Sequence, residues 1–133
     1  MSRERPLILL ILDDEARILS ALRRSLRREP YEIFTAESAV EARRVLETEA
    51  VDLVLSDHKM PGITGLQFLE EVAARRPEAV RMLITGWTET IDPNAVEALG
   101  IRAVIAKPWE DAALKETLRM AAKELGAGAG PAA

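Results

Sequence analysis

The feature that most constrains the fold is a regular alternation of short apolar runs with amphipathic segments. The first run, LILLIL at 7–12, has six consecutive aliphatic residues, which is typical of a strand covered on both faces of a sheet. Four more runs with strand character follow it, at 31–36, 51–56, 81–85 and 102–106. Strands that alternate with helices predict an α/β fold with a parallel sheet.

The segments between these runs carry helical periodicity and helix-start signals. In 15–28 the apolar residues recur three and four positions apart, with five arginines on the remaining positions. Ser38 with Glu41, and Thr64 with Gln67, each match a capping box. Asp92 before a proline predicts a short helix to about residue 99, and the last helix is expected from about residue 110.

Length and composition limit the class of protein. The 133 residues suffice for one domain, and 48% hydrophobic with 30% charged residues is typical of a compact folded chain. The absence of cysteine excludes a disulfide framework and a thiolate nucleophile, and it is compatible with the cytoplasm, where we expect the protein. We predict one domain over 1–125 and a flexible Gly/Ala-rich tail or linker over 126–133.

Charge and hydropathy argue against two kinds of partner. The formal net charge of −4 is unfavourable for direct nucleic-acid binding by the whole domain. The apolar run near the N-terminus is too short to span a bilayer and continues directly into acidic residues, so we expect neither a membrane segment nor a signal peptide.

Polar residues gather at one position in the repeating pattern, where strands end. Asp13 and Asp14 follow the first run, Asp57 follows the third, Thr85 ends the fourth and Lys107 follows the fifth. Because parallel strands point their carboxyl ends toward one edge, we expect these side chains in a single cleft if the first and third strands are neighbours.

Three converging carboxylates would repel one another strongly. Two carboxylates about 4 Å apart repel by roughly 4 kcal/mol at an effective dielectric near 20. A retained proton or a lysine partner relieves part of this repulsion, and a hard divalent cation relieves more of it. Oxygen ligands with room for water suit Mg²⁺, so we expect a magnesium site.

A metal beside Asp57 also makes phosphoryl transfer feasible. An aspartate can attack phosphorus and form an acyl phosphate. The transferred group needs its oxygens neutralised, and Lys107 and the Thr85 hydroxyl are suited to that role. A structural alternative is that Asp13 and Asp14 only cap the first helix and that Lys107 is an ordinary surface residue.

The motifs ILDDE (11–15), SDHKMPGITG (56–65), LITG (83–86) and AKPW (106–109) together resemble the receiver domain of bacterial two-component response regulators. The resemblance extends over about 7–125. It implies a flavodoxin-like (βα)5 doubly wound parallel sheet of strand order 2-1-3-4-5. It also implies a cis peptide bond between Lys107 and Pro108.

The resemblance implies a role for each site residue. Asp57 is the phosphoacceptor, and Asp14 binds Mg²⁺ directly while Asp13 holds the ion through water. The backbone carbonyl of Lys59 completes the metal ligands. Thr85 is the switch hydroxyl and Lys107 pairs with the phosphoryl group.

The resemblance also implies partners and an activity. A histidine kinase or phosphotransfer protein donates the phosphoryl group, and the protein is a phosphoacceptor that catalyses only its own phosphorylation and slow dephosphorylation. The face made by the fourth helix, fifth strand and fifth helix then signals to an unidentified output domain or protein, and this face is also a candidate for homodimer formation. A degenerate receiver that acts as a phosphorylation-independent scaffold is the alternative.

Two other functions are disfavoured by particular residues. Aspartate-nucleophile phosphatases need an acid two positions after the nucleophile, where this chain has Lys59. A flavin-binding domain of the same fold would need a Ser/Thr/Gly-rich loop after the first strand, where this chain has DDEAR.

The sequence departs from the usual receiver pattern at Val104, where many receivers have an aromatic switch residue, and Trp87 is a candidate substitute. Lys59 and Trp87 are expected to flank the phosphoryl group and shield it from water. His58 is expected in solvent rather than in phosphotransfer. Trp109 fits either core cover or an output face.

The arginines of the first helix also leave two interpretations open. They form either a solvated face or a docking surface for a kinase, with Arg17 and Arg24 among the contacts.

Overall fold

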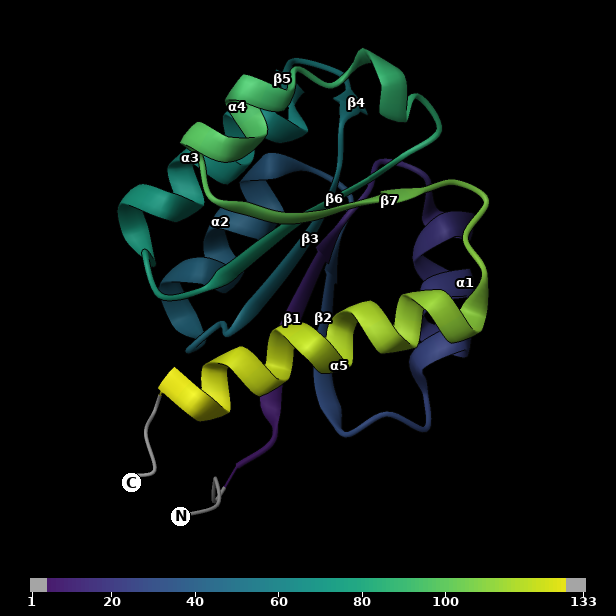
Figure 1. The fold of residues 1–133 in the computed structure, drawn as a ribbon, viewed down its shortest axis with the longest axis vertical. Coiled ribbons are helices and arrows are strands. Elements are labelled where there is room, and N and C mark those ends of the chain that lie inside the picture. The colour runs from purple at the N-terminus through teal and green to yellow at the C-terminus, as the bar shows by residue number, and fades with distance from the viewer. Residues whose placement is uncertain (1–4, 129–133) are drawn as a thin grey trace.

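A computed structural model describes the backbone of residues 5–128 and the side chains of residues 5–125. Five parallel strands form one sheet that runs through the middle of the molecule between two groups of helices (Figure 1). The strands of this sheet are β1 (Leu7–Leu12), β2 (Tyr31–Ala36), β3 (Leu53–Asp57), β6 (Val80–Thr85) and β7 (Ile101–Ala106).

The sheet has the order β2-β1-β3-β6-β7, which is the predicted 2-1-3-4-5 order of its five strands. β1 and β3 are direct neighbours, with Leu12 opposite Ser56. β3 pairs in turn with β6, and β6 with β7, so that Thr85 lies opposite Ala106. The register therefore brings the ends of four strands to the same edge of the sheet.

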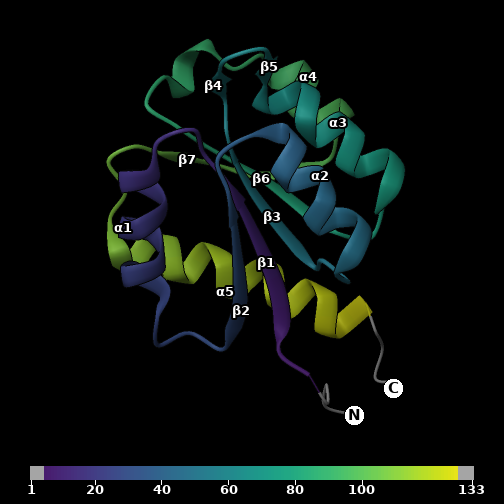
Figure 2. The same cartoon turned by 180° about the vertical axis from the view of Figure 1, so that it is seen from behind.

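The helices cover the two faces of the sheet unequally. One face carries α1 (Ala16–Leu26) and α5 (Asp111–Gly128), while the other carries α2 (Ala39–Thr48), α3 (Gly65–Arg75) and α4 (Pro93–Ala98) (Figures 1 and 2). None of the helices in the described part of the chain is long and apolar enough to cross a bilayer.

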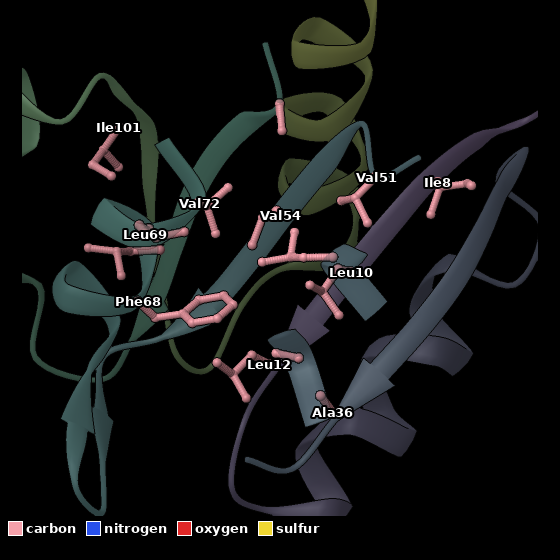
Figure 3. Close-up of a cluster of buried hydrophobic side chains, with 14 of the residues drawn as sticks. Ile8, Leu10, Leu12, Ala36, Val51, Val54, Phe68, Leu69, Val72 and Ile101 are labelled. Carbon is pink, nitrogen blue, oxygen red and sulfur yellow. The ribbon is translucent and has the colours of Figure 1, made fainter. Parts of the chain in front are cut away.

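Alternate residues of the central strands supply two hydrophobic cores. Leu10 and Val54 point to the α2–α3 face, where they meet the fully buried ring of Phe68 (Figure 3). Leu9 and Leu53 point the other way, toward α1 and α5. Full burial of each such side chain contributes roughly 1.5–3 kcal/mol, so these strands and their polar ends are held rigidly.

The helix-start predictions hold in most details. Thr64 forms a complete capping box with Gln67 at the start of α3. Ser38 caps α2 by accepting the backbone N–H of Glu41, but the Glu41 carboxylate accepts from the backbone N–H of Glu37 instead of completing the box at Ser38. Glu15 precedes α1 without a capping bond from its side chain.

The largest differences from the predicted element boundaries are in β3, α1 and α5. β3 begins at Leu53, two residues later than expected, and includes Asp57. α1 is shorter than predicted at both ends. α5 continues to Gly128, into the segment predicted as a tail, and the rest of that tail, residues 129–133, lies outside the described residues.

The prediction missed a small hairpin and a short helical turn. Strands β4 (Lys59–Met60) and β5 (Ile63–Thr64) pair antiparallel, and Gly62 between them adopts a φ of 82°. The 3-10 turn η1 spans Thr88–Thr90. Elements of two or three residues are too short to produce a recognisable period in the sequence.

Candidate functional site

The candidate site lies at the carboxyl edge of the sheet, where the strand register brings the polar residues together. Asp57 is the last residue of β3, and Asp13 and Asp14 follow the neighbouring β1. Thr85 ends β6 on the other side of β3, and Lys107 follows β7. All five residues predicted from the strand ends therefore lie at one edge of the sheet, and all of them except the fully buried Asp13 line one cleft.

The three acids form a close cluster. Carboxylate oxygens of Asp13, Asp14 and Asp57 all lie within 4.8 Å of one another. Asp13 and Asp57 are buried, whereas Asp14 is exposed at the rim. Carboxylates at this separation repel strongly, and a nearby cation or a retained proton compensates for this repulsion.

Lys107 supplies part of that compensation. Its Nζ donates to Asp13 Oδ2 at 2.8 Å and to Asp57 Oδ1 at 3.1 Å. The Lys107 side chain is only 16% exposed, so it bridges the two acids in a largely desolvated position. It does not bridge Asp14, for which no ion pair is found among the described residues.

Burial has opposite consequences for Asp57 and Lys107. Burial and the charge of Asp13 raise the pKa of Asp57, despite the opposing effects of Lys107 and of the His58 N–H that Asp57 accepts at 2.9 Å. Burial lowers the pKa of Lys107, but the hydrogen bonds and charges of Asp13 and Asp57 outweigh it, so the net shift is upward. The raised pKa of Lys107 keeps its ammonium charged, whereas the raised pKa of Asp57 means that the charged form of its carboxylate is disfavoured.

The donor set fits a hard divalent cation. All three clustered side chains offer oxygen, and Asp14 and Asp57 line a cleft that is open to solvent and has a volume of about 370 Å³. The backbone carbonyl of Lys59, the first residue of β4, is two positions after Asp57. A site with a small number of protein oxygens and space for water molecules suits Mg²⁺ better than Ca²⁺.

Thr85 contributes a hydroxyl to the opposite wall of the cleft. The side chain is 1% exposed, and its Oγ1 accepts the backbone N–H of Trp87 at 3.1 Å. This bond ties the end of β6 to the loop that follows. The hydroxyl proton remains available to a group that enters the cleft.

Lys59 and Trp87 meet at the mouth of the same cleft. Lys59 Nζ lies 5.4 Å from the centroid of the Trp87 ring, within the range of a cation–π contact. Trp87 is 54% exposed, so the pair stands at the surface above the acids. The sequence suggested that these residues flank the site, but it gave no sign that they contact each other.

His58 differs from its predicted exposure. Its side chain is half-buried, and Nδ1 is buried without a hydrogen-bond partner in the described residues. Burial and the charge of Lys59 lower its pKa. The sequence-based expectation that His58 lies in solvent therefore missed its partial burial.

Four other predicted features have clear positions. Trp109 packs against the core between α1 and α5, and its Nε1 donates to Ser25 Oγ at 3.1 Å, which favours core cover. Val104 is partly buried against the α2–α3 core. Arg17 and Arg24 are exposed on α1 and remain available to a partner. The peptide bond between Lys107 and Pro108 is cis, as the resemblance implied.

Comparison with known proteins gives a consistent family assignment. A model of the response regulator receiver domain matches residues 9–119. The hydrogenase transcriptional regulatory protein HoxA of Cupriavidus necator is 44% identical over 118 residues, which cover 88% of this chain and 24% of HoxA. The chain thus spans about a quarter of the length of such curated relatives.

Solved structures agree with this match. A CheY-like response regulator receiver domain from Methanospirillum hungatei superposes with a TM-score of 0.83 at 28% identity, covering 92% of this chain and 98% of that one. The response regulator TrrA of Thermotoga maritima, solved in complex with Mg²⁺-BeF, has a TM-score of 0.78 at 30% identity, covering 86% and 98%.

Proposed function

Because this chain belongs to the response regulator receiver domain family of two-component signalling, we propose that Asp57 accepts a phosphoryl group from a phosphohistidine. The observation that carries the proposal is the position of Lys107, whose ammonium bridges Asp13 and the acceptor Asp57. A receiver is a signalling domain, and we propose that its chemistry is confined to its own phosphorylation and slow dephosphorylation.

In the proposed reaction, a carboxylate oxygen of Asp57 attacks phosphorus and forms an acyl phosphate. The P–N bond of the donor breaks, and the donor imidazole leaves with the bonding electrons. The second Asp57 oxygen retains the His58 N–H as a hydrogen-bond donor. Such a transfer depends mainly on positioning and on neutralising the phosphoryl oxygens.

The surrounding side chains are suited to those two tasks. Lys107 can transfer its hydrogen bond from the Asp57 carboxylate to a phosphoryl oxygen, and the Thr85 hydroxyl can donate to another. Asp13, Asp14, Asp57 and the carbonyl of Lys59 would hold Mg²⁺, which when bound neutralises phosphoryl charge. The solved complex of TrrA with Mg²⁺-BeF supports this assignment.

Response regulators interact with histidine kinases and with output domains. For this chain we propose a histidine kinase or phosphotransfer protein as donor and a face of α4, β7 and α5 as the signalling surface. HoxA and related transcriptional regulators are much longer than this chain, which supports an output domain or separate partner as the receiver of the signal. Homodimer formation through the same face and a cytoplasmic location belong to the same proposal.

The scaffold alternative is less well supported. A receiver that no longer accepts phosphate has no need to bury two acids beside a third, since that arrangement lowers stability. Here Asp13 and Asp57 are buried, and both contact the same lysine. The retained geometry therefore favours phosphorylation.

The decisive experiment is incubation of the protein with acetyl phosphate and Mg²⁺, followed by intact-mass measurement. We expect a single phosphoryl adduct that is absent without Mg²⁺ and absent in Asp57→Asn. An adduct that persists in Asp57→Asn, or no adduct in the wild-type protein with this small donor or with any phosphorylated kinase, would reject the proposed function.

A further inference from the structure

Gly65 lies against the acceptor residue although it is eight positions away in sequence. It is the first residue of α3, it is buried, and its backbone N–H donates to the His58 carbonyl at 2.8 Å. This bond closes the loop that contains the β4–β5 hairpin. The N-terminal end of α3 is thereby attached directly to the end of β3.

The contact is possible only because Gly65 has no side chain. A Cβ at this position would lie 2.3 Å from the Asp57 carbonyl oxygen, 2.9 Å from His58 Cα and 2.7 Å from Leu83 Cδ2. The first two are backbone atoms, which cannot rotate away. The φ angle of Gly65 is not positive, so the position excludes other residues by space and not by backbone conformation.

The displaced backbone would carry the site residues with it. Asp57 supplies the acceptor carboxylate, and the His58 N–H orients that carboxylate. One residue further, Lys59 enters the hairpin, where it pairs with Thr64, the residue before Gly65. A shift at Gly65 would therefore move both the Asp57 carboxylate and the Lys59 carbonyl.

We propose that Gly65 is a positioning residue for phosphoryl transfer. Its missing side chain lets α3 pack against the acceptor strand, and this packing fixes the Asp57 carboxylate relative to the Lys59 carbonyl. The inference rests on the proposed function, because the two oxygens matter together only if they hold Mg²⁺ beside the phosphoacceptor.

The test compares Gly65→Ala with Gly100→Ala. Gly100 adopts a φ of 64°, and a Cβ there would lie 2.9 Å from an Arg81 guanidinium nitrogen, so alanine is also unfavourable. Gly100 precedes β7, at the opposite end of the strand from Lys107, and lies outside the site. Both variants are expected to lose stability in urea unfolding, and Gly100→Ala thus controls for a general loss of stability.

Calorimetric Mg²⁺ titration and the rate of phosphorylation by acetyl phosphate distinguish positioning from stability. Gly65→Ala should bind Mg²⁺ about 10- to 100-fold more weakly, the range found when a residue that orients metal ligands is removed. Its phosphorylation rate at saturating Mg²⁺ should fall by up to about 100-fold, as a displacement near 1 Å can cause. Gly100→Ala should match the wild-type protein in both measurements.

A folded Gly65→Ala with wild-type Mg²⁺ affinity and phosphorylation rate would overturn the inference, and so would equal losses in Gly100→Ala. If Gly65→Ala is unfolded in buffer, the comparison is made in trimethylamine N-oxide, which favours the folded state of both variants. Failure to fold there as well would identify Gly65 as structural and would also overturn the inference. The Mg²⁺ titration needs no phosphodonor, so it stays informative if the wild-type protein takes no phosphoryl adduct.

Discussion

The ammonium group of Lys59 lies 5.4 Å from the centroid of the Trp87 ring, at the mouth of the cleft that contains Asp57. The two residues come from the segments after β3 and after β6, so the contact spans the cleft. We expect a cation held over an indole ring at this position to restrict the access of water to the Asp57 carboxylate. The shielding expected from the sequence stays a prediction, and this contact is the feature through which it can be tested.

Loss of that contact should shorten the lifetime of the acyl phosphate. An exposed cation–π contact is worth about 0.5–1 kcal/mol, so its removal in a Trp87→Ala, Lys59→Asn double variant should accelerate hydrolysis about two- to fivefold. The decay is followed by intact mass after the donor is removed. Lys59→Arg keeps a cation over the ring and should decay like the wild-type protein, whereas an unchanged rate in the double variant would exclude shielding.

Asp57→Asn should be more stable than the wild-type protein at neutral pH. The pKa of Asp57 is raised in the folded state, and that shift already includes the attraction of Lys107. The folded protein therefore binds more protons than the unfolded chain between the ordinary and the raised pKa, and wild-type stability falls as pH rises through that interval.

Urea unfolding of both proteins as a function of pH measures this effect. The greater stability of Asp57→Asn should disappear below the ordinary pKa of aspartate, because Asp57 is then protonated in both the folded and the unfolded wild-type protein. If Asp57→Asn is less stable than the wild-type protein near pH 7, the negative charge of Asp57 does not lower the stability of the folded state as we infer.

Removal of the Lys107 ammonium should destabilise the protein, because Asp13 and Asp57 would then repel each other without a shared cation. Lys107→Met leaves Asp13 and Asp57 buried together without their shared cation, and loss of one partner of a buried ion pair costs about 3 kcal/mol. Mg²⁺ should restore part of this loss because it binds the folded state only. Chemical unfolding with and without Mg²⁺ measures both effects.

Lys123→Met is the matched control for that variant, because Lys123 is exposed on α5. It should change stability little, and its response to Mg²⁺ should equal that of the wild-type protein. Equal destabilisation of the two lysine variants would argue against a role for charge compensation in the cleft.

Thr64→Ala should weaken the start of α3. Thr64 Oγ1 accepts the Gln67 N–H at 3.1 Å, and the Gln67 side chain accepts the Thr64 N–H at 2.9 Å. Loss of an N-cap of this kind costs about 1 kcal/mol of folding free energy, which thermal or urea unfolding resolves. Thr64→Ser retains the hydroxyl and should be close to wild type. If both variants lose the same free energy of unfolding, the effect comes from the methyl group of Thr64 and not from its hydroxyl.

The fold was predictable to a large extent because periodicity and strand ends are local properties. The composition of Leu7–Leu12 alone indicates a strand covered on both faces, and it forms an interior strand of the sheet, between β2 and β3. Asp13, Asp57 and Lys107 could be grouped because parallel strands place their carboxyl ends together. The order 2-1-3-4-5 came from the family resemblance, and the sheet confirms it.

Other features depend on residues that are distant in sequence. The partial burial of His58 was not predicted, and the hairpin of two-residue strands that follows it leaves no periodic signal. Trp109 could belong to the core or to an outer face until Ser25 of α1 was placed beside it. In both cases the local sequence is compatible with more than one environment.

The sequence by itself determined which residues reach the functional edge, because alternation along the chain and the common direction of parallel strands leave little choice. Tertiary structure alone decided how those residues meet: that Lys107 bridges Asp13 and Asp57, that Lys59 contacts Trp87, and that Gly65 leaves room for the acceptor backbone. These contacts depend on the packing of segments far apart in sequence, and charge–charge energies and steric overlap change steeply over distances that no local pattern encodes.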